Sequence, residues 1–372
     1  MSVDVLQRLL LGFVNLTPGH VLMLGVGCLL IYLAVRHRYE PLLLLPIGVG
    51  CILANIPASG IIEEHGLLRI FYDTGIATEI LPSLVFIGIG ALTDFGPLFQ
   101  SPALVLLGAA AQFGIFGTLI MATVMGFGIR EAASIGMIGS ADGPTSIYVA
   151  AKLAPSLLGP IAVAAYSYMS LVPLIQPPVM KLLTTREERR IKMAYVERPI
   201  SKTTRVIFPV AVTIVCGLLV PMATPLIGML MFGNLMRESG VVERLARASQ
   251  EELANIVTII LGIAVGSSMS AESFLHWRTI FIIAMGLVAF ALDTAAGVLF
   301  GTLMCVLSGR RINPLVGASG ISAFPMSARV VHKVAQDEDF SNFLLMHAMA
   351  SNTAGQIASV MAGGVVLALL AK

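Results

Sequence analysis

The chain consists of long apolar runs separated by short polar stretches, and each run is near the roughly twenty residues that an α-helix needs to cross a bilayer. The pattern predicts spans at about residues 20–35, 41–56, 79–93, 102–127, 158–181, 206–222, 224–236, 254–268, 278–307 and 342–370. It therefore predicts an all-α integral membrane protein, a polytopic helical bundle of about nine to eleven spans.

Two segments, 131–156 and 310–337, have a different pattern. Each has two short halves around a stretch rich in glycine, serine and proline, and neither half can cross a bilayer alone. Residues of the two segments match in pairs: Pro144 with Pro325, Ser146 with Ser327, and Lys152 with Lys333. We interpret this as an internal repeat with one broken helix in each unit, which in transporters indicates a binding site near the membrane midplane.

The repeat predicts four parts of the chain. These are N-terminal spans and an interfacial loop at 1–77, repeat unit 1 at 78–181, a cytoplasmic loop with linking spans at 182–253, and repeat unit 2 at 254–372. Whether the two units are inverted depends on the number of spans in 206–236, which the sequence leaves open.

Composition supports a membrane protein, since 57% of the 372 residues are hydrophobic and only 12% are charged. Mean hydropathy is +0.90. A formal net charge of +2, without a basic stripe, gives no support for nucleic-acid binding. The four cysteines lie in apolar runs and have no metal-ligand spacing. No cleavage-site pattern precedes the first span, so we expect no removable signal peptide.

The main polar connection, at 182–205, is rich in basic residues. Arg186, Arg189, Arg190, Lys192, Arg198, Lys202 and Arg205 stand against Glu187, Glu188 and Glu197. By the positive-inside rule we expect this loop on the cytoplasmic side.

Asp142 is the first candidate for chemistry, because a lone carboxylate at a helix break in an apolar region is costly unless it is paired, solvated or bound to a cation. Carboxylate, hydroxyl and freed carbonyl oxygens form a hard ligand set, which suits Na⁺. The alternative role for Asp142 is an ordinary helix N-cap.

Other candidates surround the second break and the last spans. The repeat places Ser322 close to the position of Asp142, and Arg329 is a fixed cation suited to an anionic substrate or to a snorkelling position at the interface. Asn352 could complete a cation site or bond between helices, and Tyr168 has the same two alternatives. Asp293 is a second intramembrane carboxylate and a rival ion or proton site.

Several ordered motifs resemble one family. Gly139-Ser-Ala-Asp142-Gly-Pro-Thr-Ser-Ile-Tyr148 is similar to the signature of the β subunit of the sodium-ion-transporting, biotin-dependent decarboxylases, which act on oxaloacetate, methylmalonyl-CoA, glutaconyl-CoA or malonate. The stretches Asn234 to Gly240, Asn313 to Arg329 and His347 to Asn352 resemble it as well. The resemblance covers nearly the whole chain.

The resemblance implies a function and a site. In that family a partner transfers a carboxyl group to biotin, and the β subunit decarboxylates the carboxybiotin, consumes a proton and drives Na⁺ outward. By similarity the essential residues fall on Asp142, Tyr168, Asn313, Gly317, Ser322 and Arg329, with Asn352 as a further Na⁺ ligand. We expect Asp142, Ser322, Asn352, Asn313 and Tyr168 to bind Na⁺, and Arg329, Asn313 and Gly317 to bind carboxybiotin.

The family resemblance also implies partners and a location. These are a carboxyltransferase subunit, a biotin carrier subunit or domain, a small single-span membrane subunit and further copies of this chain, all at the bacterial cytoplasmic (inner) membrane. Biotin is supplied by the partner and is not covalently bound here. The short chain favours the acyl-CoA types, although the sequence does not identify the acyl substrate, the Na⁺ stoichiometry or the oligomeric state.

Two other classes of function stay open from the residues alone. A secondary Na⁺-coupled carrier or Na⁺/H⁺ antiporter would use the same broken helices and Asp142 without decarboxylase activity. A membrane scaffold is disfavoured by the cost of the buried carboxylate. A neighbouring gene for a biotin-carrying subunit would distinguish the pump from the carrier.

Overall fold

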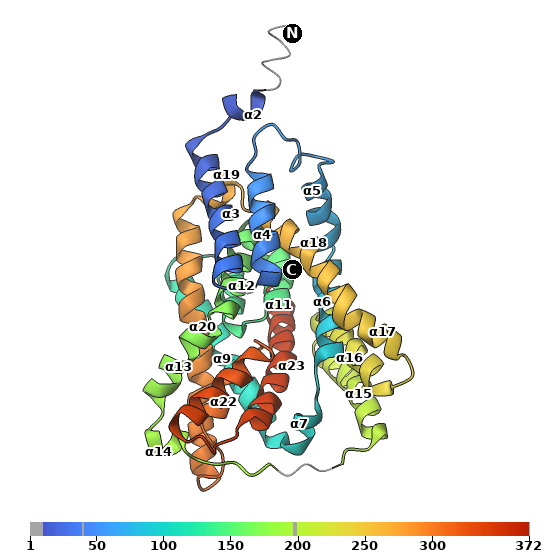
Figure 1. Ribbon diagram of the computed structural model, residues 1–372, viewed down its shortest axis with the longest axis vertical. Coiled ribbons are helices and arrows are strands. Elements are labelled where there is room, and N and C mark those ends of the chain that lie inside the picture. Colours follow the sequence, from blue (N-terminus) through green and yellow to red (C-terminus); the bar gives the residue numbers. More distant parts are fainter. Residues whose placement is uncertain (1–9, 39–40, 196–198, 372) are drawn as a thin grey trace.

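The computed structural model describes residues 10–38, 41–195 and 199–371, and within these ranges it contains helices and no strand. Glu197 and Arg198 of the basic loop lie outside the described residues. Figure 1 shows an elongated bundle, with α14 (Arg186–Arg189), α22 (Met326–Glu338) and α7 (Gly96–Gln100) near one end and α2 (Leu11–Val14) at the other.

The first half of the chain forms the helices α3 (Pro18–Arg36), α4 (Pro41–Ala54), α5 (Leu67–Phe71), α6 (Ile80–Leu92), α8 (Val105–Ala111), α9 (Phe113–Val124), α10 (Ile129–Gly136), α11 (Gly143–Leu153), α12 (Leu158–Ser170), α13 (Val172–Leu183) and α14 (Arg186–Arg189). The second half forms α15 (Lys202–Leu219), α16 (Thr224–Ser239), α17 (Glu243–Ala248), α18 (Ala254–Ser267), α19 (Ala271–Phe274), α20 (Trp277–Leu307), α21 (Leu315–Ala318), α22 (Met326–Glu338) and α23 (Leu345–Leu370).

Six helices of the described part are long and apolar enough to cross a membrane, or up to eight if two bent pairs each count as one span. One such pair is Leu67–Ile76 with Ile80–Leu92, bent by 63°. The polytopic all-α membrane bundle is confirmed. The sequence-based number of about nine to eleven spans is higher because it also included shorter segments, such as α4 with 14 residues and α16 with 16.

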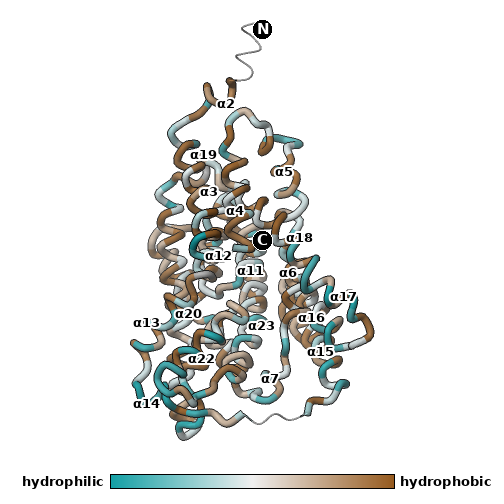
Figure 2. The backbone as a smooth tube through the Cα atoms, viewed as in Figure 1, coloured by the Kyte–Doolittle hydropathy of each residue, from teal (hydrophilic) through white to brown (hydrophobic). Residues whose placement is uncertain are grey.

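The outer surface is apolar where helices face away from the bundle, as lipid requires. Only 6% of the apolar window of α15 is buried inside the protein, and Leu218 is 78% exposed. Hydrophilic residues gather around α14, α17 and α22, which Figure 2 shows toward the lower end. This end carries the basic loop.

Two helical hairpins pack in equivalent ways. The α3–α4 hairpin packs on α18, and the α15–α16 hairpin packs on α6. Both crossings require glycine: a Cβ on Gly50 would lie 2.3 Å from the carbonyl oxygen of Ile263, and one on Gly90 would lie 1.8 Å from that of Leu230. Figure 1 shows the two hairpins toward opposite ends of the bundle, which is the placement expected of inverted units. The segment 206–236, whose number of spans the sequence left open, forms two helices.

Both expected broken helices are present. The first comprises α10, a 3₁₀ turn at Met137–Ser140 and α11, and the second comprises α21 and α22. The Oγ of Ser146 donates to the carbonyl oxygen of Met137 at 3.1 Å, and the Oγ of Ser327 donates to that of Ala318 at 3.2 Å. Each serine thus bonds back across its break to a carbonyl nine residues earlier, which supports the pairing of the two segments.

Candidate functional site

Asp142 lies at the centre of the first break. Ala141 adopts a left-handed conformation with φ of 53°, and Asp142 then begins α11 as its N-cap. One carboxylate oxygen, Oδ1, accepts a hydrogen bond from the backbone N–H of Thr145 at 3.0 Å. The N-cap role is therefore real, but it occupies only this oxygen. The other, Oδ2, accepts from the hydroxyl of Ser359 on α23 at 2.6 Å.

The two breaks meet directly. The backbone N–H of Ser322 donates to the carbonyl oxygen of Ser140 at 2.9 Å. Next to this contact, the Nδ2 of Asn352 donates to the carbonyl oxygen of Ile321 at 2.6 Å. The structure thus brings Asp142, Ser322 and Asn352 to one junction, although the fully buried Asn352 is not among the residues that line the adjoining cavity.

A chain of two hydroxyl groups links the breaks. The Oγ of Ser322 donates to the Oγ of Ser359 at 2.6 Å, and Ser359 in turn donates to Asp142. Sequence reasoning missed Ser359. The signal that could have found it is its spacing from Asn352, seven residues or two turns along one helix, which places both on the same face of α23.

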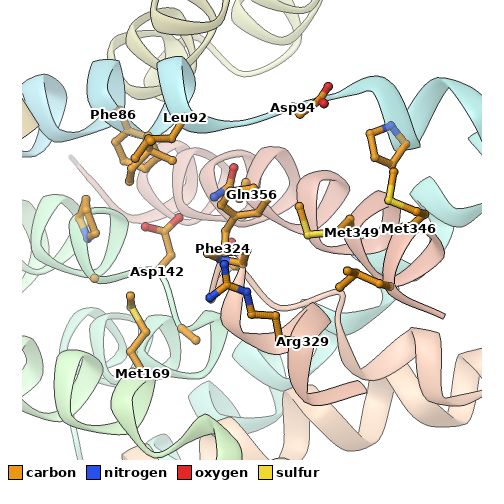
Figure 3. Close-up of a pocket in the computed structure, with 18 residues that line it drawn as sticks. Phe86, Leu92, Asp94, Asp142, Met169, Phe324, Arg329, Met346, Met349 and Gln356 are labelled. Carbon is orange, nitrogen blue, oxygen red and sulfur yellow. The ribbon is translucent and has the colours of Figure 1, made fainter. Parts of the chain in front are cut away.

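A cavity of about 570 Å³ opens beside this junction. Asp142 and Ser322 line it from the two breaks, and Arg329 lines it from α22. Figure 3 shows the Asp142 carboxylate and the Arg329 guanidinium both turned into the cavity. The other walls are largely apolar and include Phe86, Ile89, Leu92, Met169, Phe324, Met346 and Met349.

Arg329 is exposed, and among the described residues it has no carboxylate partner within ion-pair distance. A guanidinium without a partner in a mostly apolar cavity is suited to bind an anionic group. Gln356 of α23 also lines the cavity, and its Oε1 accepts from the hydroxyl of Thr93 at 3.1 Å. Sequence reasoning did not select Gln356, although it lies one turn from Asn352.

Two buried oxygen atoms without a hydrogen-bond partner belong to residues at the junction of the two breaks. Within the described residues, Oδ1 of Asn352 and Oγ1 of Thr145 are buried and have no hydrogen-bond partner. Such atoms are costly unless another group binds them. Together with the carboxylate of Asp142 they offer the hard oxygen ligands that an alkali cation prefers.

The structure places Tyr168 outside the cavity. Its hydroxyl donates to the carbonyl oxygen of Ile283, and its ring packs on Gly286, so it holds α12 against α20. The next residue, Met169, lines the cavity instead. Tyr168 therefore supports the wall of the cavity in this arrangement.

Gly317 does not line the cavity either. It lies on α21 where this helix crosses α20, and a Cβ on Gly317 would lie 1.9 Å from the carbonyl oxygen of Gly297. We expect Gly317→Ala to lower the thermal stability of the chain in detergent by about 3 kcal/mol or more, because backbone must move to admit the methyl group. Gly117→Ala is the matched control, since its new methyl group would lie 3.7 Å from the Cδ1 of Leu292, an ordinary van der Waals contact. Equal melting temperatures for the two variants would contradict this explanation.

Asn313 anchors the basic loop. Its Nδ2 donates to the carbonyl oxygens of Arg189 at 3.0 Å and Ile191 at 2.8 Å, and Asn342 donates to the same two oxygens. Its Oδ1 accepts from the backbone N–H of Leu315. The amide is thus occupied by the protein, and the structure does not bring Asn313 to the cavity.

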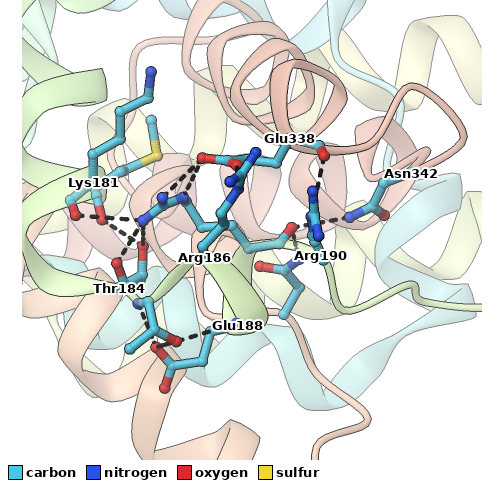
Figure 4. A network of polar contacts seen from close by, with 11 residues as sticks. Lys181, Thr184, Arg186, Glu188, Arg190, Glu338 and Asn342 are labelled. Atoms are coloured by element: carbon cyan, nitrogen blue, oxygen red, sulfur yellow. Dashed lines mark hydrogen bonds and ion pairs between the residues drawn. The ribbon is translucent and has the colours of Figure 1, made fainter.

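Glu338 completes this anchor, as Figure 4 shows. It pairs with Arg186 at 3.1 Å and with Arg189 at 2.8 Å. The hydrogen bond from Arg189, followed by the charges of both arginines, lowers the pKa of Glu338 from its ordinary value of 4.5. Above pH 4.5 the ion pairs therefore contribute their full stabilisation to the loop. This contribution is lost as the pH falls through the lowered pKa of Glu338.

We expect Glu338→Gln to loosen the basic loop at neutral pH, because the amide keeps the shape of the side chain but loses the charge. Protection factors of the amides in 184–192 should fall below those of the unaltered chain, and lowering the pH below the pKa of Glu338 should reproduce the effect. Glu187→Gln is the control, since this glutamate is 84% exposed and lies 3.8 Å from Arg310. Unchanged exchange in Glu338→Gln would show that the remaining contacts, those of the two asparagines and the Lys192–Asp339 ion pair among them, are enough to hold the loop.

Asp293 lies on α20, close to the first break. Its side chain is fully buried, and neither of its carboxylate oxygens has a hydrogen-bond partner in the described part of the chain. A Cβ on Gly114 or on Gly139 would lie within 2.2 Å of these oxygens. Asp293 therefore packs against the backbone of Gly114 and Gly139 next to the first break, and it does not line the cavity with Asp142.

Comparison with known proteins identifies the family. A family model described as the Na⁺-transporting oxaloacetate decarboxylase beta subunit matches residues 19–370. Glutaconyl-CoA decarboxylase subunit beta of Acidaminococcus fermentans is 55% identical over 359 residues, which cover 96% of this chain and 95% of that protein. Methylmalonyl-CoA decarboxylase subunit beta of Veillonella parvula is 54% identical over 361 residues, covering 97% and 96%.

A third relative, the oxaloacetate decarboxylase beta chain of Klebsiella pneumoniae, is 47% identical over an alignment of 418 positions that covers 96% of each chain. These matches agree with the apolar helices, the paired breaks and the carboxylate at their junction. The chain belongs to the beta subunits of the Na⁺-transporting decarboxylases, and it is a membrane subunit of a sodium-pumping enzyme.

Proposed function

We propose that this subunit decarboxylates carboxybiotin, which a partner subunit carries to it, and couples the reaction to outward Na⁺ transport. The observation that carries the proposal is the cavity in which Asp142 and Ser322, one from each break, meet the unpaired Arg329. A carboxylate for a cation and a guanidinium for an anion thus share one space.

Arg329 is proposed to bind the carboxylate of carboxybiotin by a charge-assisted contact with two parallel hydrogen bonds. The apolar walls solvate a charge poorly, so they favour conversion of the charged carboxylate into neutral CO₂. In the overall step the N–C bond of carboxybiotin breaks, CO₂ leaves, and the ureido nitrogen takes up one proton. Decarboxylation therefore consumes one proton for each carboxybiotin.

Asp142, Ser322 and Asn352 are proposed to bind Na⁺, with the buried Oγ1 of Thr145 as a further oxygen. A proton and Na⁺ then compete for Asp142, since each neutralises a carboxylate in a poorly solvated place. Asn313, Gly317 and Tyr168 are proposed to support this site through the loop and helix contacts described above, rather than to bind the ion directly.

The cavity adjoins a second hollow that residues of the basic loop help to line. Asp94, Pro97 and Met346 line the cavity and also a second hollow formed with Arg205 and Ile200. If the basic loop is cytoplasmic, carboxybiotin enters from that side. Outward movement of Na⁺ against about 100 mV costs about 2.3 kcal/mol per charge, so an exergonic step must drive it.

The subunit is proposed to act in the bacterial cytoplasmic (inner) membrane. Its partners are a carboxyltransferase subunit, a biotin carrier and a small single-span subunit, with homo-oligomers of this chain. An acyl-CoA is the proposed substrate of the complex, because two acyl-CoA relatives are 55% and 54% identical, against 47% for the Klebsiella oxaloacetate protein. The alignment with that protein also has 418 positions, more than the 372 residues here.

The test is Na⁺ uptake into inside-out vesicles that contain the whole complex, with each candidate substrate supplied in turn. We expect uptake with an acyl-CoA and its loss when avidin sequesters biotin. Na⁺ movement that is driven by a proton gradient and is insensitive to avidin would instead identify a secondary carrier. Uptake with oxaloacetate alone would overturn the substrate class while leaving the pump intact.

A further inference from the structure

A recess of about 530 Å³, which shares no lining residue with the cavity at Asp142, lies among basic side chains. Lys192 of the basic loop, Arg310 and Arg311 line it, together with His347 in the first turn of α23. No carboxylate of the described residues lines it. This basic recess therefore concentrates positive charge in one concave place, which attracts an anion.

Only part of this charge is neutralised within the described part of the chain. Lys192 pairs with Asp339 at 3.0 Å. Arg310 lies 3.8 Å from Glu187, and both side chains are largely exposed, so this pair is weak. Arg311 has no carboxylate within ion-pair distance among the described residues, and its guanidinium is available to an external anion.

The wall that His347 forms is also incomplete. The side chain of His347 is buried, and its Nδ1 has no hydrogen-bond partner among the described residues. The ring packs edge-on against Tyr195, with the centroids 5.6 Å apart. A buried polar atom without a partner is costly unless a further group binds it. The recess thus combines unneutralised charge with an unsatisfied polar atom.

The backbone that carries the arginines is fixed by the end of α20. The backbone N–H of Arg310 donates to the carbonyl oxygen of Cys305 at 2.8 Å. The Oγ of Ser308 accepts from the backbone N–H groups of Arg311 at 3.2 Å and Ile312 at 3.3 Å. Binding of an anion therefore has to order only the side chains of the arginines, which lowers its entropic cost.

The basic recess lies where apolar helices end. The candidate spans Pro102–Val124, Trp277–Leu307 and Leu345–Leu370 each begin or end within a few residues of its lining. Exposed apolar side chains follow on α8, which packs on α20, and precede the recess on α20: Val105, Leu106, Leu303, Val306 and Leu307. Cationic side chains beside a lipid-facing apolar surface are the surroundings that the head group of an acidic lipid requires.

We propose that the basic recess binds the phosphodiester head group of an acidic phospholipid, with Arg311 as its main contact and Arg310 and Lys192 as supporting charges. The two unesterified oxygens of a phosphodiester match the paired donors of a guanidinium. The acyl chains lie along the exposed apolar side chains at the end of α20. An acidic protein segment would match the charge but not this apolar surface. The lipid joins the basic loop to the ends of α20 and α23, so it stabilises the folded chain.

The test is the melting temperature of the full chain in detergent, titrated with dioleoylphosphatidylglycerol or with dioleoylphosphatidylethanolamine, which has the same acyl chains but no net charge. We expect the acidic lipid to stabilise the chain at lower concentration. Arg311→Gln should raise the concentration of acidic lipid for half-maximal stabilisation about tenfold, as the loss of one charge-assisted contact predicts. Arg311→Lys keeps the charge and should retain most of the affinity.

Arg244→Gln is the matched control, because it removes the same charge from an exposed position on α17 that does not line the recess. Equal stabilisation by the two lipids would overturn the inference, and so would equal titrations of Arg311→Gln and Arg244→Gln. Glycerol 3-phosphate that acts at the same concentration as the acidic lipid would overturn the lipid as the source of the phosphate. The measurement needs neither Na⁺ nor carboxybiotin, so its failure leaves the proposed function standing.

Discussion

Asp142→Asn is expected to reduce Na⁺-dependent decarboxylation by at least about 100-fold. Asparagine is as good an N-cap as aspartate, so its Oδ1 can still accept from Thr145 and α11 keeps its beginning. Its Nδ2 can donate to the oxygen of Ser359, which keeps the junction filled. The substitution therefore removes the charge and the exchangeable proton while the fold stays, and Na⁺ loses the carboxylate that the first break contributes to the cavity.

The measurement is decarboxylation by the assembled complex as a function of Na⁺, with melting temperature as the check on folding. Asp73→Asn is the matched control, because Asp73 is exposed and pairs with Arg69 at 2.8 Å. Asp142→Glu should keep a trace of activity, since the charge survives but its reach changes. Asp293→Asn should have a smaller effect, as Asp293 does not line the cavity. Normal pumping by Asp142→Asn would show that the cation binds elsewhere.

Arg329→Lys is expected to raise the concentration of carboxybiotin carrier needed for half-maximal rate by about tenfold or more. Lysine keeps the positive charge in the cavity but lacks the planar pair of donors that matches a carboxylate. Since the guanidinium has no carboxylate partner in the described residues, no ion pair within the protein is lost with it. Na⁺ affinity should stay unchanged, because the proposed ligands are the oxygens of Asp142, Ser322 and Asn352.

Titration of the complex with carrier at saturating Na⁺, and with Na⁺ at saturating carrier, separates the two affinities. Arg311→Lys is the control, because Arg311 is exposed and does not line the cavity. A parallel loss of both affinities would indicate that Arg329 holds the junction of the breaks together, and the anion site would then have to be sought at Gln356 and the neighbouring backbone.

The membrane class and the two breaks could be predicted from the sequence because both depend on local properties. A run of apolar residues must form a helix in lipid, whatever its neighbours are. A stretch such as Gly143-Pro144 favours the start of a new helix, because proline lacks a backbone donor and is best tolerated in a first turn. For the same reason Asp142 and Arg329 could be chosen as candidates: a charge in an apolar region needs a partner or a function.

The repeat allowed one tertiary statement, since the pairing of Pro144 with Pro325 placed Ser322 near the position of Asp142. It did not reveal the roles of Asn313 and Tyr168. An asparagine or tyrosine can bond to any oxygen or donor within reach, and which one it meets depends on distant chain segments. Here these are the carbonyl oxygens of Arg189 and Ile191, and that of Ile283.

Length, hydropathy and helix-breaking residues act within one segment, and they were enough to predict a helical membrane protein with two broken helices, a buried acid and a basic loop. The contact of Ser359 with both Asp142 and Ser322 could be found only in the folded chain, because a hydroxyl group is compatible with any helix face until another segment supplies its partner. The position of Arg329 in the same cavity has the same cause: hydrogen bonds and cavities arise between segments, and the packing of α22 and α23 sets which segments meet.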